Sequence, residues 1–233
     1  MPAEEGAGPR WRACADAAEL AGLAAELVLA AASEAIADHG EFRIALAGGS
    51  TPRLLYRQLR CLETDWSAWR AYFGDERCLP AGHADRNDTM ARTVWLDHVA
   101  GPQVHSMPAE RGPEDAAAAY ATLLEQYGLP DLALLGMGED GHTASLFPGH
   151  ELGNTGDAPL VLPVRNAPKP PPERVSLSLR TLNSSQSMLL LIAGTGKRRA
   201  VAEWRAGKDL PVAHLAPRKA FTVLATADAM PAD

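Results

Sequence analysis

Short runs of consecutive apolar residues alternate along this chain with longer segments in which apolar residues recur every three or four positions. The short runs are typical of strands buried on both faces of a parallel sheet, and the longer segments are typical of helices that cover such a sheet. The predicted strands are residues 42–47, 69–74, 132–135, 160–164, 187–193 and 221–225, and alternation at residues 175–179 predicts a further, half-exposed strand. This order predicts an α/β fold with a mostly parallel central sheet flanked by helices, to which a small subsidiary lobe could be attached.

Residues that are typical of helix ends lie before and between the predicted strands, as this order of strands and helices requires. Asp16 and Glu19 resemble a capping box, and Gly40 is expected to end the helix that they begin. Thr51 is a candidate cap for a second helix, with Pro52 in its first turn. Further helices are expected from Asn87 or Asp88 to Asp97, from Pro113 to Tyr127 and after Lys197.

Both ends of the chain are rich in small, acidic and proline residues, which is typical of flexible tails. A chain of 233 residues can bury one large core. We therefore expect a single α/β domain over residues 13–227, with flexible tails at residues 1–12 and 228–233.

Polar or glycine-rich segments follow four of the predicted strands. They are Gly48–Pro52, Asp75–Arg77, Gly138–His142 and Gly194–Lys197. Strand ends of a parallel sheet lie on one side, so these segments can converge. The first could hold an anion on its amides and helix dipole, and Lys197 could meet a phosphate. Taken singly, each also fits a structural role, as a packing turn, a solvated charge cluster or a surface lysine.

Asp140 and His142 follow the buried strand at residues 132–135 through a glycine-rich turn. Histidine has the ordinary pKa nearest neutrality, and a neighbouring carboxylate can orient its ring and stabilise the imidazolium. His142 is therefore a candidate general base with Asp140 as its orienting partner. A structural histidine that hydrogen-bonds within a loop is the alternative.

The segment Gly136–Gly141 also matches the G-x-G-x-x-G pattern of dinucleotide-binding folds. Such a fold needs a long helix after the last glycine, whereas Pro148 and Gly149 would end any helix soon after Gly141. The sequence thus argues against dinucleotide binding.

Charge and cysteine usage narrow the function further. A net charge of −7 argues against non-specific binding of nucleic acid, which requires a basic face. The three cysteines lie far apart without a C-x-x-C pair, which indicates a reducing compartment and no zinc site. The N-terminal residues do not resemble a secretory signal, and no run of about 18 apolar residues predicts a membrane span. We expect a soluble, cytoplasmic protein with no membrane or nucleic-acid partner.

Five motifs in combination resemble those of the 6-phosphogluconolactonases, over roughly residues 15 to 226. They are Gly48–Pro52 (GGSTP), Gly74–Arg77 (GDER) with Asn87 downstream, Leu134–Gly149 (LLGMGEDGHTASLFPG), Pro171–Arg174 (PPER) with Leu182 and Asn183, and Gly194–Lys197 (GTGK). The chain departs from the family pattern at Arg86, where serine is usual, and at Arg180, where proline is expected.

The resemblance implies a fold shared with glucosamine-6-phosphate deaminases, ribose-5-phosphate isomerases and CoA transferases. It also implies hydrolysis of 6-phospho-D-glucono-1,5-lactone to 6-phosphogluconate, the second step of the oxidative pentose phosphate pathway. No metal or cofactor is implied, the expected partner is a small phosphorylated sugar lactone, and a monomer is expected.

Residue roles follow from the same resemblance. His142 would deprotonate a water that attacks the lactone carbonyl and return the proton to the ring oxygen, while Asp140 orients its ring. The phosphate would lie on the Gly49–Thr51 amides near Arg174 and Lys197. The implied substrate-binding residues are Gly48, Gly49, Ser50, Thr51, Asp75, Arg77, Asn87, Arg174 and Lys197.

Three rival functions remain at this stage. A hexosamine-6-phosphate deaminase or isomerase would share the Asp-Gly-His element, but it would be expected to continue differently from the Thr-Ala-Ser-Leu-Phe-Pro run after His142. A non-enzymatic sugar-phosphate sensor would usually carry a DNA-binding segment, and the residues before Asp16 are neither numerous nor basic enough to form one. A metallohydrolase using Asp140, His142 and His150 would lack the usual ligand spacings.

Overall fold

The computed structural model describes residues 8–231, and its centre is a seven-stranded sheet whose neighbouring strands are all parallel. In spatial order its strands are β1 (Arg10–Cys14), β10 (Ala220–Thr226), β9 (Ser187–Ile192), β6 (Leu132–Gly136), β2 (Phe42–Leu46), β3 (Trp69–Phe73) and β5 (Gln103–Val104). A smaller antiparallel sheet has the order β4 (Asp75–Arg77), β8 (Arg174–Leu177) and β7 (Val161–Val164). The predicted α/β fold with a mostly parallel sheet is confirmed.

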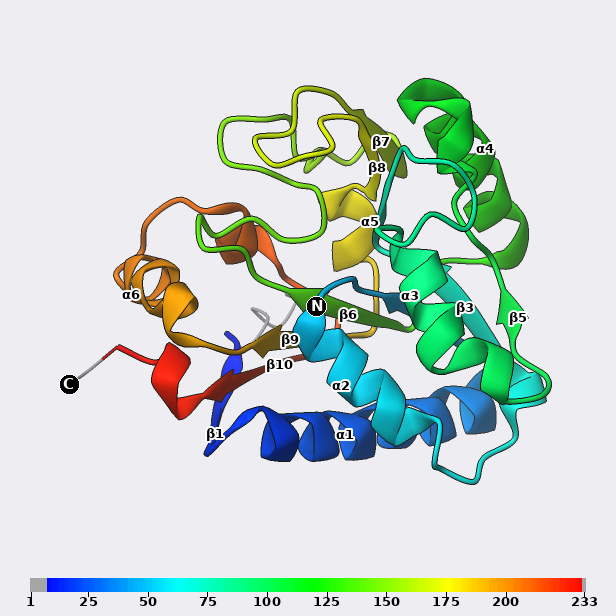
Figure 1. Cartoon of the computed structure of the whole chain (residues 1–233), viewed down its shortest axis with the longest axis horizontal. Coiled ribbons are helices and arrows are strands. Elements are labelled where there is room, and N and C mark those ends of the chain that lie inside the picture. Colours follow the sequence, from blue (N-terminus) through cyan, green and yellow to red (C-terminus); the bar gives the residue numbers. More distant parts are fainter. Residues whose placement is uncertain (1–7, 232–233) are drawn as a thin grey trace, which may run out of the picture.

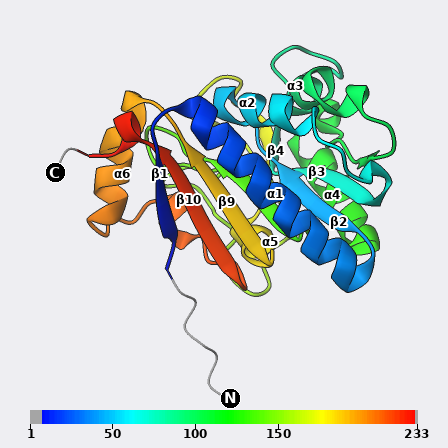
Figure 2. The same ribbon diagram turned by 90° about the horizontal axis from the view of Figure 1, so that it is seen from below.

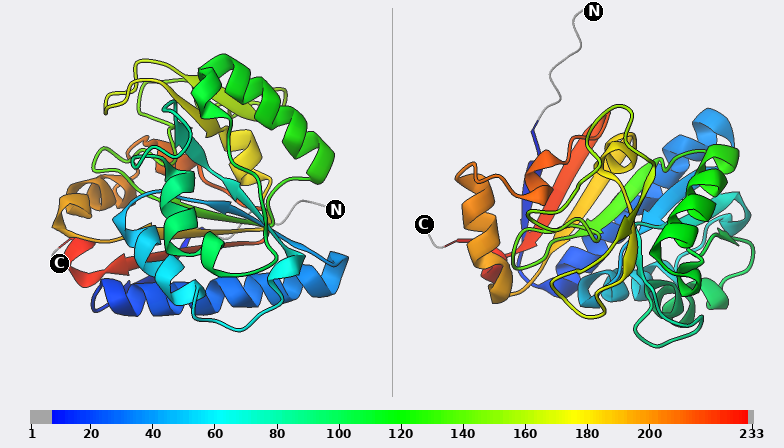
Figure 3. Two further views of the ribbon diagram at one scale, coloured as in Figure 1. Left: turned by 45° about the vertical axis from the view of Figure 1, so that its right-hand side comes forward. Right: turned by 90° about the horizontal axis from the view of Figure 1, so that it is seen from above.

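Helices and the smaller sheet cover the two faces of the central sheet (Figures 1 and 3). The helices are α1 (Ala17–His39), α2 (Ser50–Leu59), α3 (Asn87–Val94), α4 (Pro113–Tyr127), α5 (Leu179–Asn183) and α6 (Arg198–Arg205). Short 3-10 segments lie at Trp66–Ala68, Leu96–His98, Ala109–Arg111, Thr195–Lys197, Pro211–His214 and Ala227–Ala229. Helix α1 packs against β2, β9, β10 and α2, whereas α4 packs against β7 and β8. Figure 2 shows α1 running across one face of the sheet.

Helix α1 begins and ends where the sequence predicts. The Asp16 carboxylate accepts the amides of Ala18 and Glu19, and Gly40 ends the helix in the left-handed conformation with φ of 87°. By length and composition alone, this helix is apolar enough to span a membrane, with a mean hydropathy of 1.7 over 18 residues. The sequence prediction did not single it out. In the structure its buried face, which includes Leu20 and Val28, packs in the core against the central sheet.

The strand order reverses direction between β2 and β6. From β2 the chain continues outward through β3 to β5, and from β6 it continues the other way through β9 to β10. Connections on the two sides of such a point leave it in opposite directions, so a crevice opens outside the carboxyl ends of the two strands. The segments that follow β2 and β6 therefore face a common space.

Two predictions in the smaller sheet need correction. Asp75–Arg77 was predicted only as a polar segment that follows a strand, but it forms a strand of its own, β4, because it pairs with β8 at Asp75↔Ser176, Glu76↔Val175 and Arg77↔Arg174. Residues 175–179 were predicted to be a half-exposed strand. Strand β8 is instead buried at all four positions, because it lies between β4 and β7 with α4 packed against it, and α5 begins at Leu179.

The tail predictions also need correction. Arg10–Cys14 form the edge strand β1, which pairs with β10, so residues 10–12 belong to the sheet. At the other end, Ala227–Ala229 form a 3-10 segment in which Ala229 is buried. Residues 1–7 and 232–233, which the predicted tails include, lie outside the described residues.

Two helix caps differ from those predicted. Helix α2 starts at Ser50 after Gly49, whose φ of 106° favours glycine, so Thr51 lies inside the helix rather than capping it. Helix α3 starts at Asn87 itself, and Arg86 precedes it without a side-chain cap. Its terminal amides are bound by a residue from β4, which is described below.

Tyr120 of α4 ties β3 to the segment beyond β5. The Phe73 amide donates to the Tyr120 hydroxyl at 3.0 Å, and this hydroxyl donates to the His105 carbonyl at 2.9 Å. The tyrosine is fully buried, so loss of its hydroxyl would leave both backbone groups without a partner.

We predict that Tyr120→Phe lowers the free energy of unfolding by about 1–3 kcal/mol, the usual cost of unpaired buried polar groups. Urea denaturation measures this change. Tyr127→Phe, at an exposed tyrosine of the same helix, is the control and should change the unfolding free energy by less than about 0.5 kcal/mol. Equal decreases in the free energy of unfolding for the two substitutions would contradict the structural role of the Tyr120 hydroxyl.

Candidate active site

A cavity of about 310 Å³ opens at the carboxyl edge of the central sheet, at the point where the strand order reverses. The segments after β2 and β6 contribute Ala47, Gly48, Met137 and Gly138 to its lining. Its side-chain lining comes from β4, β8, α3 and the loops after β6, β7 and β9. The residues that line it are Ala47, Gly48, Gly74, Asp75, Arg77, Asn87, Leu134, Leu135, Gly136, Met137, Gly138, His142, Ala144, Lys169, Pro170, Arg174 and Lys197.

His142 is held at this cavity by the turn after β6. The Gly138 amide donates to the His142 carbonyl at 2.8 Å, and the His142 ring packs against Phe147 with 4.7 Å between ring centroids. A Cβ atom on residue 138 would lie 2.0 Å from His142 Nδ1. Glycine is therefore required at position 138 so that the imidazole can fold back over the turn.

Asp140 fixes the tautomer of His142. Its Oδ1 lies 2.5 Å from His142 Nδ1, and the His142 hydrogen bond lowers the Asp140 pKa although burial acts in the opposite direction. An ionised carboxylate only accepts hydrogen bonds, so Nδ1 carries the proton and donates it to Asp140. The lone pair of the neutral imidazole then lies on Nε2, the nitrogen available as a base.

The pKa of His142 lies below its ordinary value. Burial disfavours the imidazolium and outweighs Asp140, which acts in the opposite direction, while Lys169 lowers the pKa further. The sequence led us to expect an imidazole made more basic by its carboxylate neighbour. The structure instead indicates a ring that is neutral at neutral pH, which is the form that can accept a proton.

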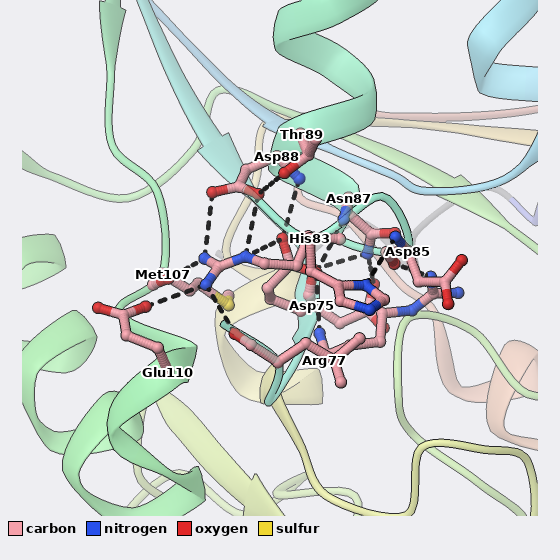
Figure 4. Close-up of polar contacts among 12 residues, drawn as sticks. Asp75, Arg77, His83, Asp85, Asn87, Asp88, Thr89, Met107 and Glu110 are labelled. Carbon is pink, nitrogen blue, oxygen red and sulfur yellow. Dashed lines mark hydrogen bonds and ion pairs between the residues drawn. The ribbon is translucent and has the colours of Figure 1, made fainter. Parts of the chain in front are cut away.

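Asp75 and Asn87 form one wall of the cavity. Asn87 Nδ2 donates to the Asp75 carbonyl at 2.9 Å and to Asp75 Oδ1 at 3.1 Å (Figure 4). Ser145 Oγ donates to Asp75 Oδ2 at 2.5 Å. Asn87 also lies against the glycine loop, because a Cβ atom on Gly48 would lie 1.9 Å from Asn87 Oδ1. This wall is polar, buried and held at several points.

Residues on β4 alternate between the cavity and the body of the protein. Asp75 and Arg77 line the cavity, whereas the intervening Glu76 points to α3. This alternation is the usual two-residue period of a strand. Arg77 lies directly opposite Arg174 in the β4–β8 pair. Like charges opposite each other are destabilising, so an anion bound beside them would relieve their repulsion.

Arg174 holds the proline-rich loop in addition to lining the cavity. Its Nε donates to the Pro171 carbonyl at 3.1 Å, and its Nη2 donates to the carbonyls of Lys169 and Pro170, each at 3.1 Å. Burial lowers its pKa, and its guanidinium lies 5.7 Å from the centroid of the Phe147 ring. Arg174 therefore sets the position of Lys169 at the mouth of the cavity.

Lys169 is a site residue that the sequence analysis missed. It lines the cavity with Lys197, and its charge lowers the pKa values of both Lys197 and His142. Within residues 8–231, neither lysine ammonium lies within 4 Å of a carboxylate. A lysine in a proline-rich linker has the pattern of a solvated spacer, and only its proximity to Arg174 in the chain could have suggested another role.

The structure brings together most, but not all, of the predicted site residues. Gly48, Asp75, Arg77, Asn87, His142, Arg174 and Lys197 line one cavity, and Asp140 supports His142 beside it. Ser50 and Thr51 instead line a separate depression of about 430 Å³ with Gly194 and Asp228, and Gly49 precedes α2. Helix α2 begins at Ser50, which turns these two side chains away from the cavity. The phosphate contact was expected at the backbone amides of residues 49–51 rather than at these side chains, and it stays a prediction.

Among residues 8–231, no group of three or more histidine, cysteine or acidic side chains is arranged to hold a metal ion. The His150 ring packs against Phe147, with 5.8 Å between the two ring centroids. The metallohydrolase alternative thus gains no support from the described part of the chain.

The fold and the site define a class of protein: an α/β enzyme with a neutral, carboxylate-oriented imidazole in a cavity lined by cations. A comparison with known families makes this more specific. The model of the glucosamine-6-phosphate isomerases/6-phosphogluconolactonase family matches residues 15–224, and the chain belongs to this family.

Individual relatives agree with this assignment. The chain is 38% identical to the 6-phosphogluconolactonase of Mycobacterium leprae over 203 residues, which are 80% of this chain and 82% of that protein. It is 35% identical to the 6-phosphogluconolactonase of Rattus norvegicus over 216 residues, which are 86% of this chain and 84% of that protein.

Solved structures show the same fold. The 6-phosphogluconolactonase of Thermotoga maritima superposes with a TM-score of 0.85 and 25% identity, covering 94% of this chain and 99% of that chain. A monomeric glucosamine-6-phosphate deaminase has a TM-score of 0.80 at 23% identity over 94% of this chain and 98% of its own. The deaminase similarity shows the shared fold alone.

We predict that the pKa of His142, measured by NMR titration of its ring protons, lies below the ordinary value of about 6.5. Asp140→Asn should lower it further, because the substitution removes the charge that stabilises the imidazolium. Lys169→Met should raise it, because the substitution removes a nearby positive charge. His142→Asn assigns the resonance, and a higher His142 pKa in Asp140→Asn would contradict this electrostatic description.

Proposed function

We propose that this protein hydrolyses 6-phospho-D-glucono-1,5-lactone to 6-phospho-D-gluconate, with His142 as the general base. The observation that carries the proposal is the neutral imidazole of His142 in one cavity with four cationic side chains, Arg77, Lys169, Arg174 and Lys197. The relatives described above carry the lactonase name across most of their length, which supports the same substrate.

The reaction begins with a water molecule beside His142 Nε2. The imidazole takes a proton from this water as the oxygen attacks the lactone carbonyl carbon, and Asp140 stabilises the imidazolium that forms. The tetrahedral intermediate then collapses with cleavage of the bond between the carbonyl carbon and the ring oxygen. The imidazolium returns the proton to that oxygen, so the enzyme ends in its starting state.

The phosphate binds at the cationic end of the cavity. Lys169 and Lys197 have no carboxylate partner within the described residues, so their charges are available to a ligand. Arg174 contributes its remaining donors and keeps Lys169 in place. Arg77 is available to the sugar or its developing oxyanion, and Asp75 accepts hydrogen bonds from sugar hydroxyls. Although the whole chain is acidic, the cavity is locally cationic.

The deaminase or isomerase alternative is less consistent with the segment after His142. Ser145 donates to Asp75 and Phe147 packs against the His142 ring, so the Thr-Ala-Ser-Leu-Phe-Pro run supports two site residues directly. Turnover of a hexosamine phosphate, or binding of sugar phosphates without any turnover, would favour the isomerase or the sensor instead.

We further propose that the protein is cytoplasmic and monomeric. Tyr127 is the one large apolar side chain that is exposed within residues 8–231, and stable oligomers usually bury larger apolar patches. Light scattering on a size-exclusion column tests the monomer.

We predict that His142→Asn lowers kcat for phosphogluconolactone hydrolysis by about 10²- to 10⁴-fold, the usual contribution of general base catalysis. Its thermal unfolding midpoint should stay close to that of the wild type. The assay uses freshly generated lactone with a chelator present. Retention of more than about a tenth of wild-type kcat would contradict the role of His142, and loss of wild-type activity to chelator would contradict metal-free hydrolysis.

We predict that Lys197→Met and Lys169→Met each raise KM for phosphogluconolactone by about tenfold, since each removes one charge-assisted contact to the phosphate. Neither substitution should change KM for unphosphorylated gluconolactone, which serves as the control substrate. Equal effects on both lactones would show that these lysines do not act on the phosphate.

A further inference from the structure

Helix α3 begins without a cap from its own sequence. The residue before it, Arg86, makes no side-chain cap, and the first amides of the helix donate instead to Glu76 of β4. Glu76 Oε1 accepts the Asn87 amide at 2.8 Å, and Oε2 accepts the Asp88 amide at 2.9 Å. Oε1 also accepts the Arg77 amide at 2.8 Å. One fully buried carboxylate thus binds three backbone donors from two elements of the site.

A buried carboxylate needs a compensating charge, because burial favours its neutral form. Burial raises the pKa of Glu76 to about 7, and the amide donors act in the opposite direction. Arg86 supplies the charge, since its Nε lies 3.7 Å from Glu76 Oε2.

Arg86 is itself buried, and each nitrogen of its guanidinium donates hydrogen bonds. Its Nε and Nη2 donate to the two carboxylate oxygens of Asp88 at 3.0 and 3.1 Å, and its Nη2 also donates to the Met107 carbonyl at 2.8 Å. Its Nη1 donates to the Leu79 carbonyl at 3.1 Å and to Glu110 at 3.0 Å. The guanidinium therefore joins the loop before α3, the helix itself and the segment at residues 107–110.

The effect of this network reaches the cavity through Asn87. Its backbone amide is held by Glu76, and its side chain donates to Asp75 and lies against Gly48. Asn87, Asp75 and Gly48 line the cavity, whereas Glu76 and Arg86 are not among the described residues that line it. Motion at the start of α3 would therefore shift the side chain that orients Asp75.

We propose that Glu76 and Arg86 are positioning residues of the active site, which act through Asn87 to hold Asp75 in the orientation that receives the sugar hydroxyls. Glu76 fixes the start of α3, and Arg86 lies beside the Glu76 carboxylate and holds the surrounding segments together. Neither residue touches the substrate. This inference rests on the proposed lactone hydrolysis and adds residues to the same site.

Arg86→Met and Glu76→Gln test this role. The first removes the charge beside Glu76, and the second keeps the shape of the carboxylate but replaces one of its oxygens with a group that cannot accept an amide. Each should raise KM by about tenfold, the usual effect of a lost hydrogen bond to a charged group, with a smaller change in kcat. The rise should be equal for phosphorylated and unphosphorylated gluconolactone, because both carry the hydroxyls that Asp75 contacts.

Arg70→Met is the matched control. Arg70 is also a buried arginine paired with a glutamate, Glu41, but it lies at the amino end of β3 rather than beside the cavity. This substitution should lower the thermal unfolding midpoint and leave KM unchanged. Loss of folded enzyme alone would lower the apparent kcat without raising KM. A rise in KM therefore distinguishes an altered site from a less stable fold.

A double-mutant cycle with Asp75→Asn tests whether the network acts through Asp75. Arg86→Met should raise KM in the wild-type background and change it less than twofold when Asp75 is already asparagine. Equal effects in both backgrounds, or unchanged KM in both Arg86→Met and Glu76→Gln, would overturn the inference. Absence of wild-type hydrolysis of either lactone would instead refute the proposed function, and calorimetric binding of 6-phosphogluconate to the same variants would still report on the positioning role.

Discussion

The reversal of strand order between β2 and β6 is the constraint on which the site depends. Because the chain leaves this point in opposite directions, no connection covers the carboxyl ends of the two central strands. The turn after β6 can then carry His142, while the turn after β2 ends at Gly48. The smaller sheet adds the remaining wall, since β4 leaves β3 through Gly74 and its two-residue period points Asp75 and Arg77 to the same space.

The charge at this edge of the sheet is opposite in sign to the net charge of the chain. The protein carries a net charge of −7, yet one cavity contains two arginines and two lysines. Arg77 and Arg174 are cross-strand neighbours, and their repulsion is offset by carbonyl groups of nearby loops. Burial, together with the charge of Lys169, holds the pKa of His142 below its ordinary value. The cationic cavity thus favours the binding of an anionic substrate, and it also favours the neutral form of His142, which can accept a proton.

The sequence predicted those features that depend on local pattern. Apolar runs identified the parallel strands β2, β3, β6, β9 and β10, but not the edge strands β1 and β5. Cap and glycine signals identified α1 and α4 with nearly their observed bounds. The motif around His142 identified the base and its aspartate.

Features that depend on pairing across the fold were missed. Strand β4 is too short and too charged to be recognised without β8, and the cap of α3 comes from Glu76, eleven residues before Asn87. Lys169 was missed because its position depends on Arg174 rather than on its own segment. The sequence did not predict that Ser50 and Thr51 line another depression, because that depends on where α2 begins.

The most direct test of the account is a crystal structure of the protein with 6-phosphogluconate bound. We expect the product carboxylate beside His142 Nε2, the sugar hydroxyls at Asp75 and the phosphate between Lys169 and Lys197. A product whose phosphate lies away from both lysines, or whose carboxylate lies out of hydrogen-bonding reach of His142, would contradict this expectation.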